Sequence, residues 1–477
     1  MSLRCLIGFV LALLLSGCAS IPQHLPRNPR VGAATGPHTP QAMRRTTAWP
    51  EHAWWRALHD HTLDQWVTRA LANNPDLHAA AARVLAAQAT IGLSNARRLP
   101  HFNANLSFTQ QYFSAQGLHP GANGTSNLYT EINPLQIQYH VDLWGRDRAL
   151  VQAARGAAQI ALAEQAQTRL LLSTAVVLRY AGLMGDKRLL RQELALVRLQ
   201  RHALALAQVA YRTGIADEHG QLQLQVQLAT SSERIASLRA ACAAERHALA
   251  ELAGEGPGTV QATPSGALPL PSSRLPENLP LGLLAHRPDI VAARWAVEAA
   301  AARVHAARAA FYPDLNLRLL AGWNSINLAD LFNPANFAHA VGPVLSLPIF
   351  TGGALRAQLR GQNAQFLEAQ DQYQGRVLAA LRQVADTLSA WEKLREQRHA
   401  QQQVLATASR QEYLAQGVWQ SGMAGLLPKL RSQIQYLQAE EKNTRLQTAS
   451  IQNWALLESA LGGGYRSIER KSVHGGG

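Results

Sequence analysis

The sequence predicts a mixed α and β membrane protein with two internal repeats, each made of one helix, two strands and a long helical hairpin. Four segments alternate apolar and polar residues one for one, which is typical of strands with one apolar face. Two long runs without proline space their apolar residues by threes and fours, which is typical of coiled-coil helices. Motifs of the first half return in the same order in the second half.

The chain opens with a secretory signal. Arg4 supplies a positive start, residues 6–15 are apolar, and Leu15-Ser16-Gly17-Cys18 follows. The segment is too short to span a membrane. The tetrapeptide resembles a bacterial lipobox, in which residues 1–17 are removed and Cys18 is lipidated. Ala19 stands where an Asp would retain a lipoprotein in the inner membrane, so this resemblance implies the outer membrane. A plain signal peptide with an incidental cysteine is the alternative.

The charge balance is basic, with a formal net charge of +14, although only 16% of the residues are charged. A basic protein can bind nucleic acid or anionic lipid. The arginines lie singly along Ala- and Gln-rich segments and form no Lys/Arg block, so we expect no nucleic-acid partner.

Three cysteines are present. Cys5 leaves with the signal and Cys18 carries lipid, which leaves Cys242 alone in the mature chain. No disulfide can therefore form within one chain, even in an oxidising compartment. Cys242 continues an apolar helical seam, so we expect a small buried hydrophobe rather than a nucleophile.

The first repeat follows a lipidated N-terminal segment, residues 18–61, and covers residues 62–253. After an opening helix we predict strands over 101–115 and 128–144, then a helical hairpin that starts at residue 146. The apolar face of the first strand carries Phe102, Ala104, Leu106 and Phe108. The second strand alternates Leu135, Ile137, Tyr139, Val141 and Leu143 with Gln136, Gln138, His140 and Asp142.

A Pro/Gly-rich linker over 254–280 leads to the second repeat, residues 281–461. This repeat has predicted strands over 314–324 and 336–350 and a second hairpin that starts at residue 354. The hairpins turn within YRTGIADEHG and WQSGMAGLLP, where Gly214 and Gly422 hold matching places. Residues 462–477 are expected to form a flexible tail.

The two halves also match at the start of each opening helix. RALANNPDLHAAAARVLAAQA precedes the first strand, and LLAHRPDIVAARWAVEAAAARV precedes the third. Proline suits the first turn of a helix and an acidic residue suits its positive end, so the Pro-Asp pairs require no catalytic role.

A membrane crossing would need a barrel, because no segment after Cys18 has the length and hydrophobicity of a transmembrane helix. Known bacterial barrels start at about eight strands, so the four predicted strands of one chain cannot close alone.

Several motifs carry a resemblance to a known family. They are the lipobox LSGC, WWRALHDHTLDQWVTRALANNPDL, VDLWGR, HRPDI, the YPDL before the third strand, and the two glycine tips. In this order and spacing, the chain resembles the outer-membrane factor family of bacterial tripartite efflux systems, the TolC/OprM-like channel proteins. Within that family it is similar to the NodT-type lipoproteins. The resemblance covers nearly all of the mature chain.

The resemblance implies a homotrimer with a 12-stranded outer-membrane β-barrel, four strands per chain, that continues as a long α-helical coiled-coil periplasmic tunnel. It implies an efflux channel that passes small molecules. The expected partners are outer-membrane lipid, a periplasmic membrane-fusion adaptor and an inner-membrane pump, RND-type or similar. We expect Gly214 and Gly422 to lie at the periplasmic tips, where the adaptor would contact the channel.

Two joints between strand and helix are expected in such a channel. Gln136, Gln138, His140 and Asp142 would face the lumen. Trp144 suits the membrane interface, and Gly145 lets the backbone change direction without a Cβ penalty. Gly352 and Gly353 would do the same in the second repeat.

Asp217 and Glu218, after the first tip, are candidates for an acidic gate that symmetry would triple. The alternative is a capping role, because both would lie in the first turn of the returning helix. The second tip departs from the family pattern, because Met423-Ala424-Gly425 follows Gly422 where an acidic residue is frequent.

No catalytic residue, cofactor or metal site is expected, because the sequence has no P-loop, C-x-x-C, H-E-x-x-H or G-x-S-x-G motif. His59 and His61 are interpreted as surface residues of an amphipathic helix rather than metal ligands. Two alternatives stay open for the function: an exit duct for type I protein secretion, and a structural periplasmic coiled-coil lipoprotein.

Overall fold

The computed structural model describes residues 52–116, 124–258 and 286–466. Cys18, the N-terminal segment before residue 52, most of the linker and the tail after residue 466 lie outside the described residues. The chain divides into two compact units. Of the described residues, the first unit includes 83–116, 124–161 and 292–374, and the second includes 52–82, 162–258, 286–291 and 375–466.

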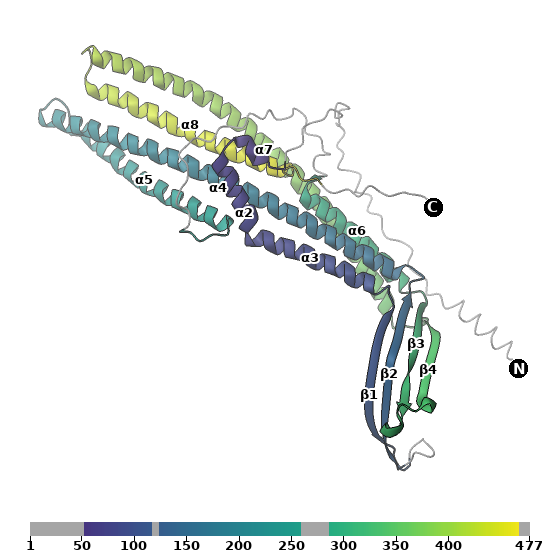
Figure 1. Ribbon diagram of the computed structural model, residues 1–477. Coiled ribbons are helices and arrows are strands. Elements are labelled where there is room, and N and C mark those ends of the chain that lie inside the picture. The colour runs from purple at the N-terminus through teal and green to yellow at the C-terminus, as the bar shows by residue number, and fades with distance from the viewer. Residues whose placement is uncertain (1–51, 117–123, 259–285, 467–477) are drawn as a thin grey trace, which may run out of the picture. The chain divides into compact units, whose positions relative to one another are not determined.

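The first unit contains one four-stranded antiparallel sheet in the order β1-β2-β3-β4 (Figure 1). Its strands are β1 (His101–Tyr112), β2 (Ser126–Val141), β3 (Asp314–Ser325) and β4 (Phe337–Ser346). The register places the predicted apolar faces side by side, because directly paired residues share one face of a sheet. One such row runs across all four strands through Phe102, Ile137, Leu319 and Val341.

Three strands end earlier than the sequence predicts. β1 ends at Tyr112 rather than residue 115, because its last partner is Ser126, the first residue of β2. β2 ends at Val141 rather than residue 144, since the next residue, Asp142, accepts hydrogen bonds from the start of a helix. β4 ends at Ser346 rather than residue 350, and Pro348 just beyond it has no N–H for a strand ladder.

Helices complete the first unit. It holds most of α3 (Pro75–Ala96) and α6 (Pro288–Ala309), the start of α4 (Arg146–Arg212) and the start of α7 (Ala354–Gln420). Close helix packing depends on Gly156, since a Cβ there would lie 2.9 Å from the Ala299 Cβ. Pro75 and Pro288 each occupy the first helical position, as their fixed φ favours.

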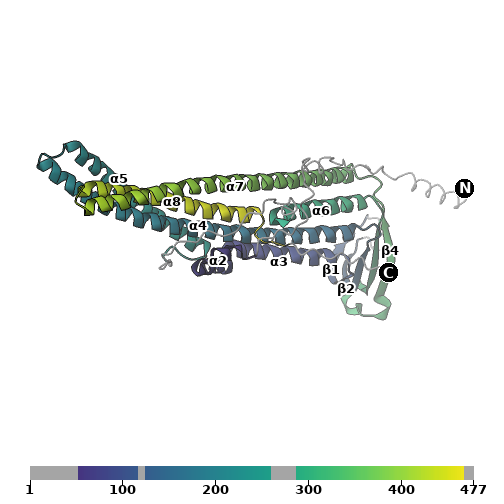
Figure 2. The same ribbon diagram turned by 90° about the horizontal axis from the view of Figure 1, so that it is seen from above.

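The second unit is helical, and each of its two hairpins has its arms side by side (Figures 1 and 2). One hairpin pairs the later part of α4 with α5 (Glu218–Leu252), and the other pairs the later part of α7 with α8 (Leu426–Ala460). Its main core gathers Trp66 of α2 (His61–Asn73), Tyr180 of α4 and Trp454 of α8, each at most 2% exposed. Burial of such side chains stabilises by about 1.5–3 kcal/mol each.

No helix in the described part of the chain has the length and apolar character that a transmembrane helix requires.

Candidate strand-to-helix joints and helical tips

At the first joint, only four residues separate the last residue of β2 from the first residue of α4. The Asp142 carboxylate satisfies free amides of the helix start, since its Oδ1 accepts from the Asp147 N–H at 3.2 Å and its Oδ2 accepts from the Arg148 N–H at 3.0 Å. Gly145 has a φ of +77°, a left-handed conformation that glycine adopts without a Cβ penalty. Asp142 is thus a helix cap that lies one residue beyond the strand in which the alternation places it.

Trp144 lies beyond the end of β2 and contacts the two residues that come just before β3. Its Nε1–H donates to the Pro313 carbonyl at 2.8 Å, and its ring stacks on Tyr312 with centroids 4.7 Å apart. The Trp144 side chain remains half exposed. An aromatic ring with one satisfied polar atom and one open face suits a boundary between polar and apolar surroundings.

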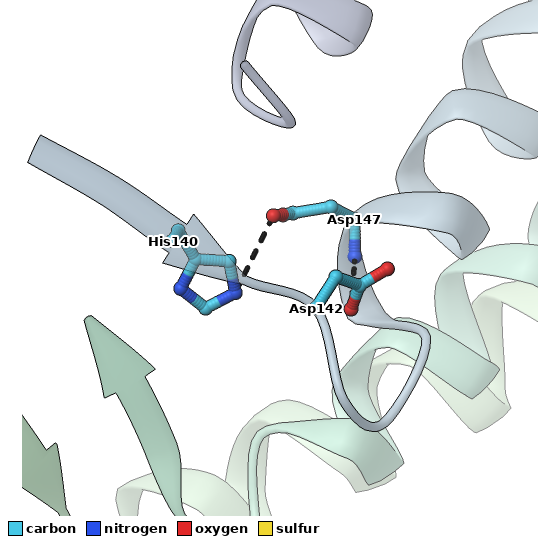
Figure 3. A group of neighbouring side chains, drawn as sticks. All are labelled: His140, Asp142 and Asp147. Atoms are coloured by element: carbon cyan, nitrogen blue, oxygen red, sulfur yellow. Dashed lines mark hydrogen bonds and ion pairs between the residues drawn. The ribbon is translucent and has the colours of Figure 1, made fainter. Parts of the chain in front are cut away.

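His140 lies at the centre of a cluster of carboxylates in the same joint (Figure 3). Its Nδ1 is 2.9 Å from Asp314 Oδ1, and its Nε2 is 3.4 Å from Asp147 Oδ2. The Asp147 side chain is 9% exposed and the Asp142 side chain 11% exposed. A cavity of about 170 Å³ lies beside the cluster, and its lining includes His140, Asp142, Asp314 and Arg146.

The second joint is built differently. Gly352 and Gly353 have φ values of +58° and +87°, and the Gly353 carbonyl accepts the first helical hydrogen bond of α7, from Ala357 at 2.9 Å. The first turn of α7 contains no acidic residue. The two joints therefore share glycines with positive φ but not the carboxylate cap.

Both hairpin tips have the same backbone geometry. Gly214 has a φ of +74° and Gly422 a φ of +76°. The Ile215 N–H reaches the Ala210 carbonyl at 2.9 Å, and the Met423 N–H reaches the Val418 carbonyl at 3.1 Å. These bonds with glycine in the left-handed region form the Schellman arrangement that ends helices.

Asp217 and Glu218 follow the first tip and are exposed. Asp217 occupies the N-cap position of α5, but its side chain makes no capping hydrogen bond. Glu218 is the first residue of α5. At the second tip Gly425 takes the N-cap position, without a side chain that could cap or carry charge.

A buried charged cluster on three helices of the second unit has no signature in the sequence. Arg234 of α5 lies 3.5 Å from Glu193 Oε2 of α4 and 3.2 Å from Glu441 Oε2 of α8. Both carboxyl side chains are at most 5% exposed. Burial, together with the neighbouring Glu193 carboxyl, raises the pKa of Glu441 to about 7. The three residues of this cluster lie far apart in the sequence, in helices whose pattern is typical of a coiled coil. No local sequence motif therefore indicates the cluster.

Two buried anchors before the Pro-Asp pairs are also missed. Asn74 precedes Pro75, and its amide donates to the Leu252 carbonyl at 3.0 Å, at the end of α5. Arg287 precedes Pro288 and donates to the Ala460 carbonyl at 2.8 Å, at the end of α8. Each residue ties the start of an opening helix to the end of a returning helix. The matching positions are visible in the sequence, but the contacts are not.

The remaining predicted residues lie as follows. Cys242 is buried in the core of the second unit, and burial raises the pKa of its thiol. His59 and His61 are exposed.

Comparisons with known proteins agree with this architecture. The model of the family described as "Outer membrane efflux protein" matches residues 66–255 and again residues 279–463. The fusaric acid resistance protein FusA of Burkholderia cepacia is 34% identical over 359 residues, which cover 74% of this chain and 68% of FusA. The multidrug resistance outer membrane protein MdtP of Escherichia coli O6:H1 is 30% identical over 481 residues, which cover 96% of both chains.

Among solved structures, the outer membrane protein VceC of Vibrio cholerae superposes with a TM-score of 0.80 at 31% identity, covering 88% of this chain and all of VceC. The proteins of this family are transport components of the outer membrane and not enzymes. Matches of this extent, over both halves of the chain, show that it belongs to the outer membrane efflux protein family.

Proposed function

We propose that this chain forms one third of a trimeric outer-membrane efflux channel that passes small molecules to the exterior. The observation that carries the proposal is the sheet. β1 and β4 each pair with one neighbour within the described residues, so the sheet has two open edges. Open edges in a membrane leave backbone groups unsatisfied, and a barrel needs about eight strands or more. Three chains would join twelve strands edge to edge.

The outer face of that barrel would be the apolar row of the sheet. In the single chain Phe102 is 66% exposed and Val341 is 77% exposed. Large apolar side chains on one face of a sheet are unfavourable in water and favourable in hydrocarbon. Lipidation at Cys18 would add an anchor in the same membrane.

The chain would contain two structural repeats. The family model matches two segments, and each contains an opening helix (α3 or α6), two strands and a helical hairpin in the same order, although the first match begins within α2. The anchors Asn74 and Arg287 support this, because each links the corresponding pair of helices in its own half.

The hairpin tips would contact a periplasmic membrane-fusion adaptor, which an inner-membrane pump, RND-type or similar, would accompany. Ile215 is 81% exposed and Met423 is 76% exposed, beside the two tip glycines. Exposed apolar residues at the end of a coiled coil suit a helical partner. Asp217 and Glu218 would form an acidic ring at the first tip, where threefold symmetry brings like charges together.

Purified protein in planar lipid bilayers tests the channel and its gate. We expect a trimeric native mass and a small conductance that rises when Asp217→Ala and Glu218→Ala are combined, because the acidic ring would no longer restrict the closed tip. Glu233→Ala, an exposed change farther along the same helix, is the matched control. Equal conductance of the wild type, the double variant and the control would refute the gate assignment. Asp217 and Glu218 would then be residues of the helix start only. A stable monomer without conductance would refute the channel itself.

The relatives favour small molecules over secreted proteins as cargo. FusA is named for fusaric acid resistance and MdtP for multidrug resistance. Deletion of this gene should therefore increase susceptibility to aromatic acids or drugs and leave the pattern of secreted proteins unchanged. The reverse result would support type I secretion.

A further inference from the structure

We propose that the first joint binds a divalent transition metal ion through His140, Asp142 and Asp147. One imidazole nitrogen and one oxygen from each carboxylate lie within 4.8 Å of one another. Figure 3 shows the three side chains gathered between the end of β2 and the first turn of α4. The inference is independent of the proposed channel function.

The protonation of His140 decides what its inner nitrogen can bind. Nδ1 is 2.9 Å from Asp314 Oδ1, and a carboxylate at this distance favours the tautomer with the proton on Nδ1. In the neutral ring, Nε2 is then an acceptor with a free lone pair. Nε2 faces Asp147 Oδ2 at 3.4 Å, so two acceptors point toward one another. A cation between them turns this repulsive contact into an attractive one.

Asp147 is the independent indication of a ligand. Its side chain is more than nine-tenths buried, with 9% of its surface exposed. Among the described residues, no hydrogen bond to its carboxylate is recorded, and His140 is its one charged or chargeable partner. A buried carboxylate without a donor carries a large desolvation cost unless it is paired or coordinates a metal. Asp142, by contrast, is already paired with Arg148 at 3.3 Å.

The separation between His140 and Asp147 fits zinc, and the Asp142 oxygen would have to move closer to them if it lies near the 4.8 Å limit. With metal bonds of about 2.1 Å, a separation of 3.4 Å between Nε2 and Oδ2 corresponds to an angle of about 108° at the metal, which is nearly tetrahedral. Asp314 completes the usual arrangement of a ligating histidine, whose other ring N–H donates to a carboxylate and so fixes the ring. Asp142 Oδ2 accepts from both the N–H and the Nε–H of Arg148, whereas Oδ1 accepts only the Asp147 N–H and keeps a second lone pair for the ion.

The competing occupant is a proton. A protonated His140 would bridge Asp147 and Asp314 without any metal. The charged groups around the ring are these two carboxylates, Asp142, Arg148, which is paired with Asp142, and Arg146, which lines the same cavity. Their oxygens outnumber the cationic groups, so a divalent ion neutralises more of the cluster than one proton does.

Zinc uptake by the full-length protein tests the site. The chain would be purified without an oligohistidine tag, stripped with EDTA, freed of the chelator and titrated with Zn²⁺ alone by calorimetry. We expect one strong site per chain in the wild type that Asp147→Asn and His140→Gln each weaken at least about tenfold. Asp314→Asn should weaken it about 10–100-fold, as for a carboxylate that orients a ligand.

Two matched controls separate the joint from other surface groups. Asp76→Asn removes an exposed acid from the first turn of α3, and His61→Gln removes an exposed imidazole. Both should bind Zn²⁺ like the wild type. Equal binding by the wild type and the joint variants would overturn the proposal and show weak surface binding only. A wild type that binds no Zn²⁺ strongly would also overturn the proposal. The competing interpretation, in which a proton occupies the cluster, would then stand.

A measurement on the wild type guards against variants that fail to fold. Co²⁺ in a four-coordinate site with nitrogen and oxygen ligands absorbs visible light much more strongly than six-coordinate Co²⁺. We expect the strong bands at one Co²⁺ per chain, and their displacement by Zn²⁺. Weak six-coordinate bands alone would reject the site. Channel conductance is measured separately, so loss of the metal site leaves the proposed function standing.

Discussion

At the scale of single residues, the two anchors before the Pro-Asp pairs differ in chemistry. Arg287 is 5% exposed and makes a bidentate pair with Asp289, at 3.0 and 2.8 Å, besides its bonds to Ala460 and Gln383. Asn74 is neutral, and its Oδ1 accepts from the N–H groups of Asp76 and Leu77. Removing a charge from a buried pair leaves the other charge unpaired, which costs more than losing a neutral cap.

Arg287→Ala should therefore destabilise the start of α6 by about 3 kcal/mol, whereas Asn74→Ala should destabilise the start of α3 by about 1–2 kcal/mol. Native-state hydrogen exchange of the amides in those first turns measures the local opening free energy. The control is Arg382→Ala, which breaks an exposed pair with Asp386. If Arg287→Ala lowers the local opening free energy no more than Arg382→Ala does, the buried pair contributes no more stability than a surface pair.

At the scale of elements, each hairpin tip is a helix end stopped by one glycine. Gly214 and Gly422 adopt positive φ, and no atom lies within 4 Å of a Cβ built on either of them. The cost of a side chain there is therefore backbone strain and not a clash. A residue other than glycine in the left-handed region costs about 1–2 kcal/mol.

Gly422→Ala should destabilise the second tip by about 1 kcal/mol, seen as faster amide exchange in the last turn of α7. Gly417→Ala is the matched control, five positions earlier on the same helix. It has no positive φ and open space around its Cβ. Alanine stabilises a helix interior by about 0.5–1 kcal/mol relative to glycine, so this control should slow exchange. Opposite signs are expected, and equal signs would refute the role given to the tip glycine.

At the scale of the whole molecule, buried acids make stability depend on pH. Burial raises the pKa of Glu441 to about 7, together with the Glu193 carboxyl, and burial raises the pKa of Glu458 to about 7. An unfolded glutamate titrates near about 4.3. Between these values the folded chain binds more protons than the unfolded chain, so its stability falls as pH rises. The stabilising effect of protonation is complete below the unfolded pKa and is lost as pH rises through about 7.

The thermal midpoint of the helices should thus decrease between pH 5 and pH 8. Glu441→Gln has the shape of the protonated glutamate but does not titrate, so the thermal midpoint of this variant should decrease less with pH. The midpoint of the variant should exceed that of the wild type most at pH 8. Circular dichroism of the purified protein measures both, and Glu233→Gln, on an exposed site, is the control. A wild-type midpoint that rises over this range would contradict the assigned direction for the buried acids.

Periodicity in the sequence was enough to locate the elements. The run without proline from Arg146 coincides with α4, and alternation located all four strands, because side chains alternate in strands and recur every third or fourth residue in helices. The strand ends were less determined. Leu143 continues the alternation, yet Asp142 ends β2 because its carboxylate binds the amides of α4.

The sequence by itself determined the order of elements, the glycines of the joints and tips, and the resemblance to efflux channels, since each depends on neighbours along the chain. Only the tertiary structure decided that His140 meets Asp314, that Arg234 meets Glu193 and Glu441, and that Arg287 reaches Ala460. These contacts join residues far apart in the chain. Hydrophobic periodicity fixes which face of an element is buried, but not which polar side chains meet when those faces pack.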